Sequence, residues 1–216
     1  MGKVVVAASL VWACAACSGL PGPPATEETV TPDDPGGVLF ADDFSDRTSG
    51  WPSRRELHWS QDYVDEGYRI TVDQDELRFV LAAATAKLDV TDVVVEVDLR
   101  FDSNYTDAGA GVICRALDQN NYYFFEIEDG TVSIVRFLED VQTFLVDDEP
   151  TQAFNPSGSR LRIECIGDSL TFFVNGEQVA SAQDDSLSHG DVGLIAGGAA
   201  EGLTDVRFDN FLARSP

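Results

Sequence analysis

The chain has 216 residues, and its 14 lysines and arginines against 38 aspartates and glutamates give a formal charge of −24 at pH 7. This balance excludes nucleic acid as a partner, because binding to a phosphate backbone requires clustered cations that displace counterions. With 44% hydrophobic and only 24% charged residues, the composition is too apolar for a disordered chain and predicts one globular domain with appendages.

The first residues have the pattern of a signal peptide. Lys3 precedes an apolar run of about ten residues, half of the roughly 20 that a membrane-spanning helix needs. Ala15 and Ala16 then precede Cys17, an arrangement that resembles the lipobox of bacterial lipoproteins. The resemblance implies removal of residues 1–16, lipidation of Cys17 and anchoring on the extracytoplasmic side of a bacterial envelope membrane.

The departure from the lipobox is Cys14, at a position where the pattern prefers Leu, and a lipid on Cys14 itself would put the bulky Trp12 two residues before it. An ordinary signal peptide cut after Ala16 also stays open as an alternative.

Residues 17–37 have the composition of a tether. The stretch 18–37 holds five of the nine prolines and shows no hydrophobic period, so it cannot bury enough apolar area to offset the entropy of ordering. Extended as polyproline II it would reach about 60 Å, at about 3.1 Å per residue. We therefore expect the domain, residues 38–216, to stand away from the membrane and to contact it through the lipid anchor only.

From residue 38 onward the sequence predicts an all-β domain. Short runs rich in Val, Ile, Phe, Tyr and Thr are separated by Gly, Asn, Asp and Pro, and no window keeps a helical period over three turns. The expected strands are 38–44, 67–72, 77–82, 92–101, 110–117, 121–128, 131–138, 159–167, 170–175, 178–182, 190–196 and 205–213, with hairpin turns at 128–130 and 175–176. Such short antiparallel strands favour a two-sheet sandwich or jelly roll over a barrel.

Alternation within the strands predicts which side chains face the core. In strand 92–101 one face holds Val93, Val95, Val97, Leu99 and Phe101, and the other holds Val94, Glu96, Asp98 and Arg100, as a sheet with one dry and one wet side requires.

Cys114 and Cys165 both lie on the apolar side of their strands. A disulfide between them and two separate buried thiols both agree with the pattern.

Four segments carry a resemblance to a known family. They are LFADDFSDRTSGW (39–51), AGVICRALDQNNYYFFEIEDGTVSIVR (110–136), RLRIECIGDSLTFFVNGEQVA (160–180) and the closing GDVGLIAGG…VRFDNFLAR (190–214). They resemble the concanavalin A-like lectin/glucanase sandwich, and more narrowly the laminin-G-like domains of unknown function on bacterial lipoproteins. The resemblance implies a two-sheet antiparallel jelly roll over nearly all of 38–216. Its members bind glycans or proteins, and a minority of relatives hydrolyse sugars.

Two carboxylate pairs have the spacing of a sugar-hydrolase site. A retaining glycosidase needs two carboxyl groups about 5 Å apart, and one strand places neighbours on one face at i and i+2. Glu96 with Asp98, and Glu126 with Glu128, have this spacing. The loose similarity of EVDLRFD to the E-x-D-x-x-E strand of jelly-roll glucanases breaks at Asp102. We therefore interpret the first pair as a solvated outer face and the second as hairpin-edge charges, with catalysis as the alternative.

Sugar binding without catalysis needs exposed aromatic rings beside hydrogen-bonding side chains. Trp59 and Tyr63 lie in the polar stretch 53–68, which we expect to form a loop over the sandwich. Arg115 is followed closely by Asp118 and by amide side chains, a polar edge of the kind that a glycan site uses. These three residues are the candidate ligand contacts, although an arginine beside an aspartate is also a common surface pair.

The sequence gives little support to a metal or cofactor site. No stretch fits the EF-hand calcium loop, and the only histidines, His58 and His189, have no companion ligand at useful spacing for zinc. The family resemblance leaves one option, since Asp42 or Asp43 would approach Asp209 if the first and last strands lie side by side. We expect no cofactor other than a structural calcium ion at that place.

These observations together predict an envelope-anchored, non-catalytic binding module whose partner is a glycan or an envelope protein. A glycoside hydrolase of the jelly-roll class and a purely structural envelope lipoprotein are the alternatives.

Overall fold

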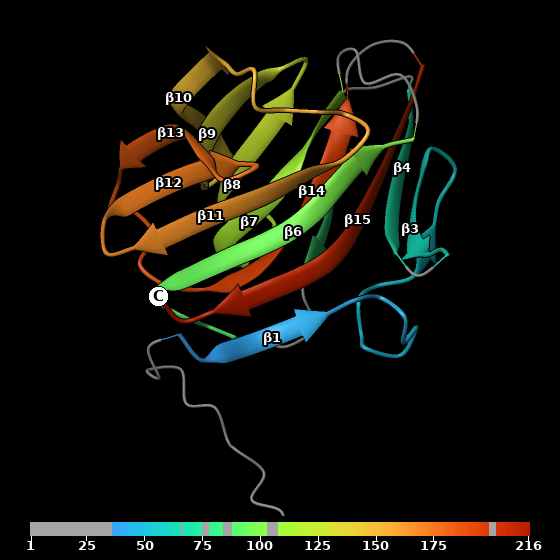
Figure 1. Cartoon of the computed structure of the whole chain (residues 1–216), viewed down its shortest axis with the longest axis horizontal. Coiled ribbons are helices and arrows are strands. Elements are labelled where there is room, and N and C mark those ends of the chain that lie inside the picture. The colour runs from blue at the N-terminus through green and yellow to red at the C-terminus, as the bar shows by residue number, and fades with distance from the viewer. Residues whose placement is uncertain (1–35, 66, 75–77, 84–87, 103–107, 199–201) are drawn as a thin grey trace, which may run out of the picture.

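The computed structural model describes residues 36–65, 67–74, 78–83, 88–102, 108–198 and 202–216 (Figure 1). The predicted signal peptide, the lipidation site Cys17 and nearly all of the tether lie outside these residues. Within the described residues, no helix has the length and hydropathy that a membrane crossing would require.

The domain consists of two antiparallel sheets packed face to face, as Figure 1 shows. The nine-stranded sheet has the order β13 (Glu177–Gln183), β12 (Ser169–Val174), β11 (Ser159–Ile166), β6 (Val93–Phe101), β15 (Gly202–Arg214), β4 (Tyr68–Gln74), β3 (Trp59–Tyr63) and β2 (Arg54–Arg55), and β1 (Val38–Asp42) also pairs with β15. The six-stranded sheet has the order β10 (Val141–Pro150), β9 (Thr131–Leu138), β8 (Asn121–Glu128), β7 (Ala108–Asp118), β14 (Asp191–Gly198) and β5 (Arg78–Ala83). The predicted all-β sandwich is confirmed.

The core lies between the sheets and follows the predicted alternation. In β11 every second residue is buried, and β12 repeats the pattern with Leu170, Phe172 and Val174 inside. Each fully buried side chain of this size contributes about 1.5–3 kcal/mol to folding. The outward residues of β6, among them Glu96 and Asp98, are left on the opposite face.

A disulfide joins the two sheets. Cys114 of β7 and Cys165 of β11 are bonded, with their Cα atoms 6.9 Å apart, and both are fully buried. Of the two arrangements that the sequence allowed, the structure has the bridge.

Much of the segment 53–68, which was expected to be a loop, is instead part of the nine-stranded sheet. It forms the hairpin of β2 and β3, and β3 continues into a pairing with β4 in which Tyr63 faces Tyr68. The prediction was wrong because the polar residues of β3 hide its alternation. The edge strand β10 was also missed, since most of its side chains are exposed and carry no alternating pattern.

Candidate functional site

The outer face of the nine-stranded sheet carries a layer of arginines and carboxylates. Strand alternation places Glu96 and Asp98 of β6 beside Arg160 of β11, because residues 98 and 160 pair directly in the ladder. Arg160 forms ion pairs with Glu96 at 3.3 Å and with Asp98 at 3.1 Å. On the other side of β6, residue 209 of β15 pairs with residue 98, so Asp209 joins the same layer.

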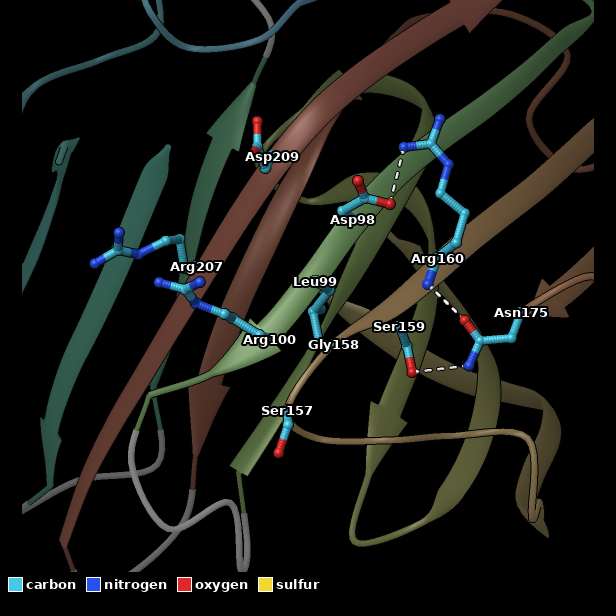
Figure 2. A pocket seen from close by; sticks show the side chains of 10 residues that line it. All are labelled: Asp98, Leu99, Arg100, Ser157, Gly158, Ser159, Arg160, Asn175, Arg207 and Asp209. Atoms are coloured by element: carbon cyan, nitrogen blue, oxygen red, sulfur yellow. Dashed lines mark hydrogen bonds and ion pairs between the residues drawn. The ribbon is translucent and has the colours of Figure 1, made fainter. Parts of the chain in front are cut away.

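A pocket of about 380 Å³ opens in this layer. It is lined by Asp98, Leu99 and Arg100 of β6, Arg207 and Asp209 of β15, Ser157, Gly158, Ser159 and Arg160 at the start of β11, and Asn175. Figure 2 shows Asp98 between Asp209 and Arg160, and Arg100 and Arg207 reaching out in the same direction from adjacent strands. The pocket therefore presents hydrogen-bond donors and acceptors side by side.

Asn175 fixes the rim of the pocket. It lies in the hairpin turn between β12 and β13 with a φ of 50°, which confirms the predicted turn. Its side-chain oxygen accepts a hydrogen bond from the backbone N–H of Arg160 at 2.8 Å, and its Nδ2 donates to the carbonyl of Ala153 at 2.7 Å. Nδ2 also lies 3.1 Å from Oγ of Ser159. The loop before β11 is thereby tied to the turn, which keeps the rim in place.

The guanidinium groups of the pocket are held by protein acceptors. Nη1 of Arg160 donates to Asp98 and, at 2.9 Å, to the carbonyl of Asn210. Nε of Arg100 donates to Asp102 at 2.9 Å, and Nε of Arg207 lies 3.3 Å from the same carboxylate. Arg100 has no other hydrogen bond within the described residues, so its two terminal amino groups are available to a ligand.

Asp209 has a different environment from Asp98. Burial raises the pKa of Asp209, the backbone N–H of Asn210 lowers it, and the nearby carboxylates of Asp98 and Asp43 raise it further. Within the described residues it forms no ion pair, whereas Asp98 is bound by Arg160 and by Nδ2 of Asn210 at 2.8 Å. Asp209 is therefore the acceptor in this pocket that is least satisfied by the protein itself.

Comparison with known proteins finds similarity in structure but not in sequence. No protein-family model and no curated protein sequence matches the chain. A carbohydrate-binding module of class CBM66 from Bacillus subtilis is similar with a TM-score of 0.61 and 20% identity, over 77% of this chain and 96% of that one. A Bacillus subtilis protein of unknown function with a galectin-like fold has a TM-score of 0.64 and 12% identity, over 84% and 97%. A structure from work on endo-acting O-glycanases of the human gut microbiota has a TM-score of 0.56 and 10% identity, over 82% and 99%.

The chain has a galectin/concanavalin A-like β-sandwich fold. The identities are too low to carry more than the fold, so the chemistry of the site depends on this chain's own residues.

The sandwich places the first predicted carboxylate pair on its outer face, as expected. Glu96 and Asp98 both contact Arg160, and Glu96 also lies 3.7 Å from Arg214. Asp98, but not Glu96, lines the pocket.

The second carboxylate pair lies on the outer face of the six-stranded sheet. Glu128 is partly exposed, but Glu126 is only 6% exposed, so its interpretation as a hairpin-edge charge was wrong. Burial raises the pKa of Glu126 to about 8, and the carboxylates of Glu128 and Asp148 add to this increase. Its Oε1 has no hydrogen-bond partner within the described residues.

Glu126 is buried because both faces of β8 are apolar. Phe125 and Ile127 face the main core, while Phe124 shares the side of Glu126 and packs in a second cluster with Val135. The run YYFFEIE could have signalled this from the sequence, since it has no wet face.

The candidate ligand contacts have other positions than predicted. Tyr63 is 2% exposed, and its hydroxyl accepts hydrogen bonds from the N–H groups of Gly50 at 3.0 Å and Trp51 at 2.7 Å. Trp59 is half-buried in β3 and packs against the core. Neither ring is the exposed loop aromatic that the polar sequence around it suggested, because the segment forms a strand.

Arg115 is a buried structural residue, which we call a brace because its guanidinium links three backbone segments, and it does not lie on a surface edge. It is 1% exposed, with a φ of 51° at an irregularity in β7. Its guanidinium donates to the carbonyls of Leu187 at 2.9 Å, Gly167 at 2.6 Å and Thr91 at 3.2 Å. The polar residues after Arg115 suggested a surface, but the bulge turns this side chain inward.

The proposed calcium residues are brought near each other without forming a metal centre. β1 does pair with β15, and the carboxylates of Asp43 and Asp209 interact electrostatically. However, no group of three acidic, histidine or cysteine side chains that could hold an ion occurs in the described part of the chain. Asp42 is instead a structural acceptor, bound by the N–H of Phe44 at 2.7 Å.

The pocket residues that sequence reasoning missed are Arg100, Arg160, Asn175 and Arg207. Each arginine lies at an outward position of a predicted strand, which was a readable signal. The position of β6 between β11 and β15 could not be predicted from the sequence, because strand order depends on long-range pairing.

Proposed function

We propose that this domain is a non-catalytic glycan-binding module and that the pocket between β6, β11 and β15 is its binding site. The observation that carries the proposal is the set of Asp98, Arg160, Asn175 and Asp209 around one pocket on a sandwich similar to a carbohydrate-binding module. Sugar hydroxyls both donate and accept, and adjacent hydroxyls match the planar, two-pronged groups of arginine and carboxylate. The volume of the pocket, about 380 Å³, lies within the range of small-ligand sites.

The arrangement favours binding over hydrolysis. A retaining hydrolase needs one carboxyl group that carries a proton and one that is ionised. Glu96 and Asp98 are both engaged by Arg160, and Glu126, which does have a raised pKa, is nine-tenths buried on the other sheet. An envelope protein as partner is the alternative to a glycan.

The test is calorimetric binding of a panel of neutral and acidic sugars to the full chain and to Arg160→Ala. Arg160→Ala should weaken binding by tenfold or more, since a hydrogen bond to a charged group contributes about 1.5–3 kcal/mol. Arg162→Ala is the matched control, because this neighbouring arginine pairs with Glu164 and does not line the pocket. If the chain hydrolyses chromogenic glycans and Glu126→Gln or Glu96→Gln abolishes this activity, the domain is a hydrolase and the proposal is wrong. If no sugar binds, the proposal is refuted as well.

We also propose that the module is tethered to the bacterial envelope through Cys17. The alanines before this cysteine and the proline-rich stretch after it support the proposal.

A further inference from the structure

A second pocket lies beside the first on the same face of the molecule. It has a volume of about 640 Å³ and is lined by Ala41, Asp42, Asp43, Asp46 and Ser49 around the end of β1, by Asn210, Phe211 and Leu212 of β15, and by Arg160. Arg160 thus lines both pockets.

The boundary between the two pockets is a bulge in β15. The pairing of β15 with β6 shifts between Asp209 and Leu212, and Asn210 at the shift has a φ of 50°. The carbonyl of Asn210 accepts a hydrogen bond from Nη1 of Arg160, and its Nδ2 donates to Asp98. Arg160, which lines both pockets, and Asn210, to which it is bonded, therefore form a polar ridge between them.

The second pocket offers acceptors beside apolar surface. Asp43 and Asp46 each use Oδ1 to accept hydrogen bonds from Ser45 and Thr48, respectively, and these bonds lower the pKa of both carboxyl groups. The Oδ2 atoms of both have no hydrogen-bond partner in the part of the chain that the structure describes. Leu212 supplies half-buried apolar surface next to them. A chain of sugar rings has this same mixture of hydroxyl edges and apolar faces.

We propose that the two pockets form one extended site for a neutral oligosaccharide of at least two sugar units, which crosses β15 over the ridge of Arg160 and Asn210. The inference rests on the proposed function and adds the ligand class and its length. Neutral glycans are favoured because ionised Asp43 and Asp46 lie at one end of the site and the chain as a whole carries a charge of −24. Polyanionic glycans meet repulsion both during approach and in the second pocket.

The experiment compares neutral monosaccharides with their oligosaccharides of two to five units. Glucose, galactose, xylose and fructose and the corresponding oligosaccharides are titrated into the full chain by calorimetry. Affinity should rise by about tenfold or more, equivalent to about 1.4 kcal/mol, when the ligand becomes long enough to occupy the second pocket, and should then level off.

A blocking variant separates the second pocket from the first. Ala41 is exposed in β1 and lines the second pocket only, so the long side chain of Ala41→Arg should lie against Asp43 and Asp46 and fill it. This variant should lose the gain in affinity with ligand length and keep the monosaccharide affinity. Val38→Arg is the control, because Val38 is an exposed residue of the same strand outside the pocket.

The outcomes distinguish this inference from the proposed function. The extended site would be overturned if monosaccharides bind and longer ligands bind no more tightly. It would also be overturned if the increase in affinity with ligand length persists in Ala41→Arg. In both cases the first pocket would remain a glycan site. Tighter binding of uronic-acid oligosaccharides than of neutral ones would overturn the ligand class. Absence of binding to any sugar would overturn the proposed function, and the extended site with it.

Discussion

Individual side chains in this protein have roles that depend on what surrounds them more than on their chemical type. Arg100 and Arg115 are both arginines at strand positions, yet the first lies in the pocket with its terminal amino groups available and the second is a buried brace. Glu96 and Glu126 differ in the same way, since the first binds two arginines and the second is buried among apolar side chains. Substitution of the two buried residues should therefore affect stability and not sugar binding.

Replacement of Glu126 by glutamine should change the pH dependence of stability. Because its pKa in the folded state, about 8, lies above the ordinary value of 4.5, folding favours the protonated carboxyl. The contribution of Glu126 to stability is therefore fully present below about pH 4.5 and is lost as the pH rises through about 8. Glu126→Gln cannot ionise, so we expect it to be more stable than the wild type at pH 9, by about 1.4 kcal/mol or more.

Denaturant melts at pH 5 and pH 9 measure this effect. Glu177→Gln is the matched control, because it makes the same substitution at an exposed position of β13. An equal difference in free energy of unfolding between wild type and Glu126→Gln at both pH values would disprove the buried, protonated state.

Removal of the Arg115 guanidinium should destabilise the domain without altering sugar affinity. Arg115→Met leaves three carbonyl groups without their charged donor, and we expect a loss of about 3 kcal/mol or more in the free energy of unfolding. Chemical denaturation gives the stability, and calorimetry on the remaining folded protein gives the affinity. If Arg115→Met is as stable as the wild type but no longer binds sugar, Arg115 belongs to the binding site and this prediction is wrong.

Alternation along the strands β6, β11 and β12 creates both the core and the outer face that carries the first pocket. The buried valines and leucines of these strands face the other sheet, and the disulfide from β11 to β7 holds the two layers together. The same alternation orients Asp98 and Arg160 outward, next to each other across the ladder. A strand in the wrong orientation would therefore lose the core and the pocket at once.

Val174→Asp should unfold the domain, whereas Glu96→Gln should not. Val174 is fully buried in β12, and a buried, unpaired charge costs several kcal/mol, comparable with a whole stability of about 5–15 kcal/mol. Glu96 lies on the outer face, where its ion pairs are partly exposed and contribute little. Circular dichroism and denaturant melts compare the two variants, and a cooperative, near-native melt of Val174→Asp would contradict the strand orientation.

At the scale of the whole molecule, we propose that the folded domain and the residues before it have different roles. The domain carries both pockets on one face, while the first residues carry the pattern of export and lipid attachment. The prolines between them predict a tether that lets the pockets reach ligands beyond the membrane surface.

Metabolic labelling with a fatty-acid analogue should modify the wild type and fail to modify Cys17→Ala. The reason is that the two small residues Ala15 and Ala16 directly precede Cys17, as in a lipobox, although Cys14 stands where that pattern prefers Leu. Cys14→Ala is the matched control and should still be labelled. Label that survives Cys17→Ala and disappears with Cys14→Ala would move the lipid to the other cysteine.

Local signals in the amino-acid sequence were enough to predict the class of fold, most strands, the faces of β6 and the turn at Asn175, because period-two alternation and turn residues act over a few positions. They also placed Asp98 on the wet side. The position of β6 between β11 and β15, which brings Asp98, Arg160 and Asp209 to one pocket, follows from long-range pairing that no local pattern encodes. The burial of Tyr63 and Arg115 likewise comes from packing between distant segments, whereas the apolar run around Glu126 was a local signal of its burial. Alternation along a strand predicts the face of the sheet on which a side chain lies, but the order of the strands determines which side chains it contacts there.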